Sequence, residues 1–140
     1  MVKTPTKPRS SCPINFGLEI FGDKWTLLIL RDMLMAGKKT YKEFQASDEG
    51  IASNILADRL QRLEHCGLIL QKPSPSDGRQ ICYLLTDAGR KLLPALVEMA
   101  YWGATHDSKT SAPKAFVAAY KQNKDGLLQA LAAGFDPSKS

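Results

Sequence analysis

The chain has 140 residues, a formal net charge of +5 and a sequence pI of about 9.2. Its length is enough for one domain with a hydrophobic core, and its apolar content of 44% is typical of a globular protein. Three scattered cysteines and two histidines make a disulfide framework or a metal site unexpected, and we expect no cofactor. No apolar run suits a signal peptide or a membrane span, so we expect a cytoplasmic protein without membrane contact.

The N-terminal third begins with a basic segment and two helices. Residues 1–11 carry three basic side chains, two prolines and no acid, which is typical of a flexible arm that is either solvated or touches phosphates. Pro13 predicts the start of a short apolar helix, over residues 13–22, that must pack on its own domain or on a second copy. Asp23 can cap the next helix, over residues 24–36, whose apolar side chains on nearly every face indicate the central core helix.

The next two predicted helices form a helix-turn-helix arrangement. Thr40 begins a short helix over residues 41–46, with Glu43 at the spacing of a capping box. A tight polar turn leads to the second helix, which Ser53 can cap and which Gly67 can end in a left-handed conformation. A short helix, a brief turn and a second helix with a polar leading face together favour DNA binding.

The second helix of this pair has two unlike faces. At 100° per residue its apolar stripe consists of Leu56, Leu60 and Leu63. The opposite face begins with short hydrogen-bonding side chains, as entry into a major groove requires, although an ordinary amphipathic surface helix has the same periodicity. Asn54 would pair with adenine, and Asp58 would either accept from a cytosine amine or pair with Arg62. The predicted base-reading residues are Ser53, Asn54, Asp58 and Gln61.

A predicted β-hairpin follows this helix in the position of a wing. Strands over residues 68–72 and 80–85 flank a loop with two prolines and an Asp-Gly turn. Arg79 at its base either reaches DNA or is a solvated loop charge. Arg59 lies nearer the apolar stripe, so we expect it to brace the domain or to reach a flanking phosphate. The predicted phosphate contacts are Lys38, Lys39, Tyr41, Lys42, Arg59, Arg62 and Arg79.

A long helix over residues 88–104 is expected to follow, capped by Thr86 or Asp87. Pro94 should kink this helix or lie in its early turns. The broad apolar surface of the helix exceeds what one small domain can cover. Residues 105–112 then read as a linker, and two short helices, over residues 113–121 and 125–133, precede a tail at 136–140.

Several motifs at fixed spacings carry a family resemblance. They are Cys12-Pro13, Gly22-Asp23-Lys24-Trp25-Thr26-Leu27-Leu28-Ile29-Leu30, the stretch from Gly50 to Leu56, Arg59-Leu60-x-x-Leu63-Glu64-x-x-Gly67-Leu68-Ile69, Tyr83-x-Leu85-Thr86-x-x-Gly89, Pro94 and Trp102-Gly103. Their order resembles the HxlR-type family of winged helix-turn-helix transcriptional regulators, within the MarR-like superfamily. The resemblance covers residues 12–103 and says little about the segment that follows.

The resemblance implies a mainly α-helical winged helix-turn-helix fold with a small β-hairpin wing, in a dimeric DNA-binding protein. The corresponding division is an arm over 1–11, a DNA-binding domain with dimerisation helices over 12–104, and a linker with a helical extension over 105–140. The N-terminal and long C-terminal helices would form the two-fold interface. The predicted interface residues are Ile14, Phe16, Leu18, Phe21, Leu96, Met99, Ala100 and Trp102.

The family also suggests that the cysteine before the proline, Cys12, senses electrophiles or oxidants in some members. Its place at a helix N-terminus near Arg9 would favour the thiolate, whereas the simpler alternative is a small, half-buried residue. Cys66 and Cys82 are expected to be packed thiols.

We therefore expect a repressor that binds a pseudo-palindromic operator in double-stranded DNA as a homodimer. Electrophiles, oxidants or a small ligand would regulate it. Catalysis is not expected, because no phosphate-binding loop, nucleophile elbow or metalloprotease motif is present. The alternative is a winged-helix protein-interaction module without DNA binding, since one fold can serve both functions.

Overall fold

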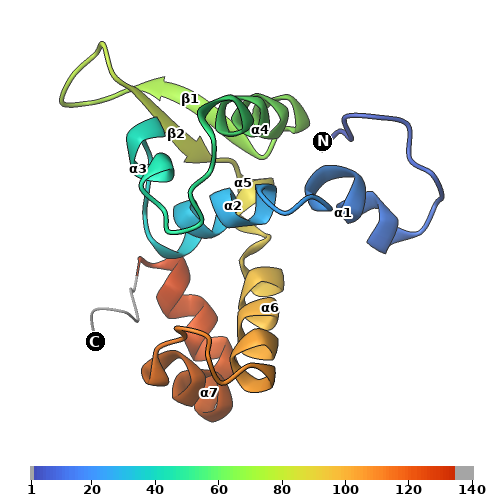
Figure 1. The fold of residues 1–140 in the computed structure, drawn as a ribbon, viewed down its shortest axis with the longest axis vertical. Coiled ribbons are helices and arrows are strands. Elements are labelled where there is room, and N and C mark those ends of the chain that lie inside the picture. The colour runs from blue at the N-terminus through green and yellow to red at the C-terminus, as the bar shows by residue number, and fades with distance from the viewer. Residues whose placement is uncertain (1, 135–140) are drawn as a thin grey trace.

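The structure is a computed structural model that describes residues 2–134, and the predicted tail at 136–140 lies outside the described residues (Figure 1). In the described part, the chain order is α1 (Pro13–Phe21), α2 (Thr26–Met35), α3 (Tyr41–Gln45), α4 (Ser53–Cys66), β1 (Ile69–Pro73), β2 (Ile81–Leu85), α5 (Asp87–Arg90), α6 (Leu93–His106) and α7 (Lys114–Ala132). The mainly α-helical fold with one β-hairpin is therefore confirmed. Within residues 2–134, no helix combines the length and the apolar character needed to cross a bilayer.

The main hydrophobic core lies between α2, α4 and the start of the hairpin. The predicted stripe of Leu56, Leu60 and Leu63 is confirmed, since each of these residues is at most 2% exposed. It packs with Leu30 of α2 and Phe44 of α3, among others, in one cluster. Each buried leucine or phenylalanine side chain contributes about 1.5–3 kcal/mol through loss of contact with water. The core therefore fixes which face of α4 remains outside.

The predicted capping box of α3 is confirmed, whereas at α2 Asp23 binds the first amides but Trp25 occupies the N-cap position. The Asp23 carboxylate accepts hydrogen bonds from the backbone N–H groups of Trp25 (3.0 Å) and Thr26 (3.1 Å), and α2 begins at Thr26, two residues later than predicted. Thr40 and Glu43 form the predicted capping box at the start of α3. These caps satisfy donors that have no partner inside a helix.

The predicted cap of α4 by Ser53 is wrong, whereas its predicted end is confirmed. Ala52 occupies the N-cap position with extended backbone (φ −68°, ψ 146°), and its methyl group offers no acceptor. Ser53 is instead the first residue of the helix, where its hydroxyl accepts a hydrogen bond from Gln45 of α3 (2.8 Å). Gly67 ends the helix with φ 86°, a conformation that costs a non-glycine residue about 1–2 kcal/mol.

The wing is an antiparallel hairpin with Ile69 opposite Leu85 and Pro73 opposite Ile81. It is also joined to the helix-turn-helix, because the backbone N–H of Tyr83 donates to the carbonyl of Lys39 (2.7 Å). The wing and the turn before α3 are thus held together by a main-chain bond.

The single long helix expected after the wing is wrong, because the chain forms α5 and α6 with a break at Lys91 and Leu92. Thr86 caps α5 by accepting from the backbone N–H of Gly89 (3.2 Å). Pro94 lies in the first turn of α6, the part of a helix where its missing N–H removes no hydrogen bond.

The two helices predicted after residue 112 are present, merged into α7 across a kink at Asn123 (φ −160°, ψ 87°). Phe116, Leu127 and Leu131 of α7 form a second core cluster with Leu93 and Val97 of α6. Figure 1 places this pair of helices on the side of α2 away from α4. The part of the extension that the structure describes, up to residue 134, therefore leaves the outer face of α4 open.

Candidate nucleic-acid interface

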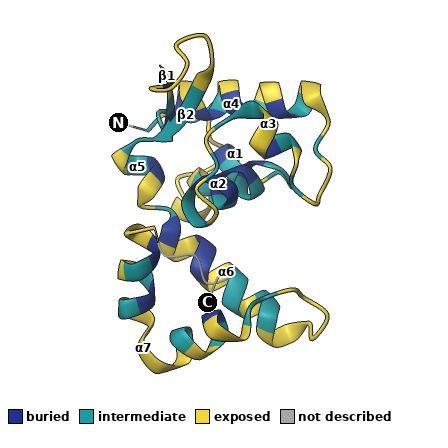
Figure 2. Cartoon of the chain, turned by 90° about the vertical axis from the view of Figure 1, so that its left-hand side faces the viewer, coloured by how far each residue is buried: buried dark blue, intermediate teal, exposed yellow. Residues whose placement is uncertain are grey.

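The outer face of α4 carries the four predicted base-reading side chains. Ser53, Asn54, Asp58 and Gln61 are all exposed, and so is Ala57 between them. Figure 2 shows exposed segments along α4. The leading end of the helix thus presents small or short side chains with donors and acceptors. Such an end fits a major groove about 12 Å wide. Most of the hairpin loop is exposed as well, and Figure 2 shows it at the same end of the molecule as α4.

The start of α4 is tied to α3 at Ser53. The Tyr41 hydroxyl donates to the Ser53 carbonyl (2.6 Å), and the Gln45 amide donates to the Ser53 hydroxyl (2.8 Å). Tyr41, a predicted phosphate contact, therefore uses its hydroxyl proton within the protein. These two bonds fix the distance between the helices of the motif.

Arg59 braces α4 against the start of α2. Its Nε donates to the Asp23 carboxylate (2.9 Å), and its guanidinium also pairs with Asp58. The alternative pairing of Asp58 with Arg62 is not the one found, because Arg59 offers its terminal nitrogen to that carboxylate. A paired Asp58 repels phosphate less than an isolated carboxylate would.

Hydrogen bonding makes Asp23 an unusually strong acid. Burial acts to raise the pKa of its carboxyl group, but the Thr26 hydroxyl, the Arg59 guanidinium and the Trp25 and Thr26 amides outweigh burial and lower the pKa to about 2. The charged form is therefore the one that the fold stabilises.

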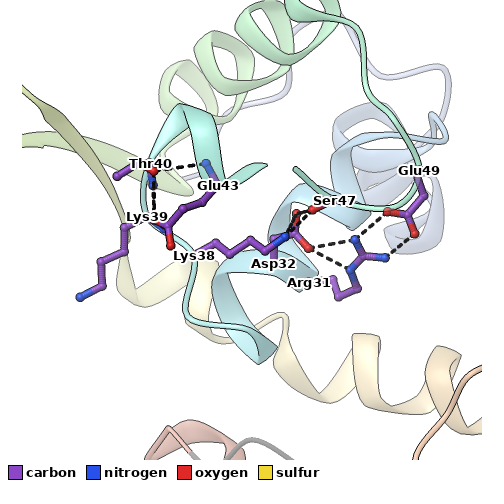
Figure 3. Close-up of polar contacts among 8 residues, drawn as sticks. All are labelled: Arg31, Asp32, Lys38, Lys39, Thr40, Glu43, Ser47 and Glu49. Carbon is purple, nitrogen blue, oxygen red and sulfur yellow. Dashed lines mark hydrogen bonds and ion pairs between the residues drawn. The ribbon is translucent and has the colours of Figure 1, made fainter. Parts of the chain in front are cut away.

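The predicted phosphate-contacting lysines fall into two groups. Lys39 and Lys42 are exposed at the start of α3, and Figure 3 shows the Lys39 side chain pointing away from the neighbouring polar cluster. Lys38 instead donates from Nζ to the Ser47 hydroxyl (2.6 Å) and lies 3.9 Å from the buried Asp32 carboxylate. The ammonium group of Lys38 is thus paired within the protein, although the side chain is 25% exposed. Arg79 is exposed in the hairpin loop.

The polar cluster around Asp32 was not predicted from the sequence. It also contains Arg31, which binds the Glu49 carboxylate at 2.7 and 2.9 Å. The hydrogen bonds from Arg31 lower the pKa of Glu49 to about 2. The signal in the sequence was the charged pair Arg31-Asp32 within a largely apolar core helix.

The predicted dimer residues divide into exposed and packed side chains. On α1 and α6, five large apolar residues are 42–73% exposed: Ile14, Phe16, Leu18, Met99 and Trp102. Leu96 is 7% exposed and belongs to the main core, against which Phe21 also packs. Ala100 packs against the second cluster.

Cys12 is exposed at the N-cap of α1. The guanidinium of Arg9 binds Glu19 (3.0 Å) and Asn15 (2.8 Å), so its charge is paired within the protein. The preceding segment reaches the end of α4, where the Lys3 amide donates to the Cys66 carbonyl (3.1 Å). Burial raises the pKa of the Cys66 thiol.

Comparison with known proteins finds similarity to helix-turn-helix proteins. The family described as HxlR-like helix-turn-helix matches residues 20–111. YybR, an uncharacterized HTH-type transcriptional regulator of Bacillus subtilis, is 30% identical over 98 residues, which cover 70% of this chain and 78% of YybR. Mb3122, an uncharacterized HTH-type transcriptional regulator of Mycobacterium bovis, is 36% identical over 96 residues, which cover 69% of this chain and 60% of Mb3122.

Solved structures share the fold. PA1607 aligns with a TM-score of 0.67 and 39% identity over 74% of this chain and 72% of that chain. The redox regulator HypR in its oxidised form aligns with a TM-score of 0.60 and 31% identity over 69% of this chain and 98% of that chain. The reduced form of the transcriptional regulator YodB from Bacillus subtilis aligns with a TM-score of 0.56 and 27% identity over 73% of this chain and the whole of that chain.

The brace between α2 and α4 predicts a pH dependence of stability. The pKa of Asp23, about 2, lies below its ordinary value of 3.8, so its stabilising contribution is complete above about pH 4 and is lost as the pH falls toward 2. We expect Asp23→Asn to lower the free energy of unfolding by about 1–2 kcal/mol at pH 7 and to flatten its fall between pH 4 and 2. Urea denaturation followed by circular dichroism measures both quantities.

Asp125→Asn, at an exposed acid on α7, is the matched control and should leave the dependence of the free energy of unfolding on pH unchanged. If the free energy of unfolding fell equally steeply between pH 4 and 2 in the Asp23 variant and in the unmodified chain, the brace would be contradicted.

Proposed function

Because the chain belongs to the HxlR-like helix-turn-helix family of DNA-binding transcriptional regulators, we propose that it binds a pseudo-palindromic operator as a homodimer. The α4 helix of each protomer enters a major groove with its outer face. The observation that carries this proposal is the exposed polar face of α4, whose opposite face is locked in the core.

Side chains at the leading end of α4 recognise the DNA bases directly. Asn54 pairs with adenine through its amide, and Ser53 and Gln61 donate to or accept from neighbouring base edges. Asp58 accepts from a cytosine amine while Arg59 offsets its charge. Arg59 itself acts as a brace, because its Nε is bound to Asp23.

Phosphate contacts hold the domain in register. Lys39 and Lys42 lie at the start of α3, and Arg79 lies in the loop of the wing. Arg62, half-buried on α4, reaches the nearer strand. Such contacts carry little sequence information, and each adds about 0.9 to the slope of log affinity against log salt concentration.

The dimer forms through the apolar faces that a single chain leaves uncovered. Exposed side chains of α1 and α6 supply these faces, together with a groove of about 540 Å³ whose lining includes Leu27, Leu28, Leu96, Met99 and Ala100. Exposed apolar surface of this kind in a globular protein marks an interaction site. Two-fold symmetry then places two α4 helices one DNA turn apart, roughly 34–36 Å.

Repression follows from operator occupancy, in the cytoplasm where the operator lies. We include Cys12 in the proposal as a sensor of electrophiles or oxidants. Its thiol is exposed at the start of α1, the helix assigned to the dimer contact, so modification there would act on the spacing of the two α4 helices. The similarity to the redox regulator HypR supports this assignment.

Operator binding is the direct test of the proposal. The intact chain is titrated into a labelled duplex from the region upstream of its own gene, in which footprinting defines the operator, and anisotropy is recorded at several salt concentrations. We expect Asn54→Ala to weaken operator binding by about 1–3 kcal/mol with little effect on a scrambled duplex. Lys42→Ala should weaken binding to the operator and to the scrambled duplex equally. It should also lower the slope of log affinity against log salt concentration by about 0.9 per chain.

Absence of any preference for the operator in the unmodified chain would favour a protein-interaction module without DNA binding. Lys121→Ala, on the distant α7, serves as the control for loss of one lysine.

Dimer formation has its own test. The unmodified chain should have twice the mass of the 15.4 kDa chain by light scattering after gel filtration. Trp102→Glu places a charge in the proposed interface and should give the mass of one chain, because an unpaired charge cannot be buried there. Ile81→Glu, at an exposed apolar residue of the wing, should remain dimeric. A monomeric unmodified chain would refute the dimer.

A further inference from the structure

Asp32 is a buried acid in the core helix, and no DNA contact assigned above includes it. It lies in the C-terminal half of α2 and is 4% exposed. Its neighbours Ile29, Leu30 and Met33 belong to the main core. A buried carboxylate is costly unless positive charge and hydrogen-bond donors surround it. The groups that surround Asp32 therefore indicate what this charge does.

One carboxylate oxygen of Asp32 reaches the turn between α3 and α4. The Ser47 hydroxyl donates to Oδ2 at 2.5 Å (Figure 3). The same hydroxyl accepts from Lys38 Nζ at 2.6 Å, and that ammonium lies 3.9 Å from Oδ2. The serine thus links the lysine to the aspartate.

The other carboxylate oxygen holds a second connection to the same turn. Arg31 donates to Oδ1 of Asp32 from Nε (3.1 Å) and from a terminal nitrogen (2.8 Å). The Arg31 guanidinium also binds both oxygens of Glu49, two residues after Ser47 (Figure 3). The turn that leads into α4 is therefore anchored to α2 at two points.

The backbone of the same residue also holds the turn before α3. Lys38 belongs to that turn, and its backbone N–H donates to the Asp32 carbonyl (2.9 Å). Both ends of α3 are thus fixed to a single residue of α2. Since α4 begins at Ser53, six residues after Ser47, the position of its leading end depends on these bonds.

We propose that Asp32 is a positioning residue for the DNA-binding helix: it fixes the turn before α4 through Ser47 and withholds the ammonium of Lys38 from DNA. This inference rests on the proposed DNA-binding function of α4. It assigns different roles to the lysines at the start of the motif. Lys39 and Lys42 are exposed and contact phosphate, whereas Lys38 stabilises the fold through its bond to Ser47.

The test compares affinity for the operator duplex with affinity for a scrambled duplex of equal length, over a range of salt concentrations. We expect Asp32→Asn to lower the ratio of the two affinities by about tenfold, the loss of one base contact. Binding to the scrambled duplex should at the same time become more salt-dependent, by about 0.9 per chain, because Lys38 is released to phosphate. A purely structural role would not steepen the salt slope.

Three variants complete the design. Asp48→Asn makes the same charge change at an exposed acid of the same turn and should alter neither quantity. Ser47→Ala removes only the linking hydroxyl and should lower the affinity ratio. Lys38→Met in the Asp32→Asn background should restore the salt slope of the unmodified chain while the ratio stays low.

The outcomes separate this inference from the proposed function. If the unmodified chain prefers the operator but Asp32→Asn and Ser47→Ala behave as Asp48→Asn does, the positioning role is refuted. If Asp32→Asn lowers the ratio without steepening the slope, the withholding of Lys38 is refuted. If Asp32→Asn does not fold, Ser47→Ala decides alone, because it leaves the bonds from Arg31 to Asp32 in place. Failure of the unmodified chain to prefer the operator refutes the proposed function instead.

Discussion

The attachment of α4 to α2 is the constraint on which the rest of the structure depends. A leucine stripe fixes the rotation of α4 about its axis, since Leu56, Leu60 and Leu63 must stay in the core. Polar bonds then fix its position along and across α2: Asp23 binds Arg59 of α4, and Asp32 binds Ser47 in the turn before it. Apolar contacts alone are not directional, so the hydrogen-bonded charges supply the geometric precision that base recognition needs.

Local signals in the sequence were enough to predict the order of the elements up to the wing and most helix ends. The capping box of α3, the left-handed Gly67 and the leucine stripe depend only on residues close in the chain. The break between α5 and α6 was missed because apolar periodicity continues through Lys91 and Leu92, and only the backbone requirement of Pro94 selects a new helix start. Ser53 looked like a cap, but the residue before it already had the extended backbone.

The outer face of α4 could be predicted from periodicity, whereas the roles of its charged neighbours could not. Whether Lys38 faces solvent or a buried acid depends on contacts between residues fifteen positions apart, such as Ser47 and Asp32. The same applies to Arg59 and Asp23, which lie thirty-six positions apart. Pairs of residues this far apart in the chain produce no periodic pattern in the amino-acid sequence. Membership of the HxlR-like family indicates the regulator function, and the structure shows which side chains near α4 are exposed.

The most direct test of the central claim is photocrosslinking from the outer face of α4. A photoreactive amino acid replaces Asn54 in the full chain, and a second preparation carries it at Lys121 on α7 as a control. The account predicts that residue 54 crosslinks to bases in two half-sites of the operator, with centres roughly 34–36 Å apart, while residue 121 does not. Crosslinks from residue 121 but none from residue 54, with operator binding intact, would show that another surface of the protein meets the DNA.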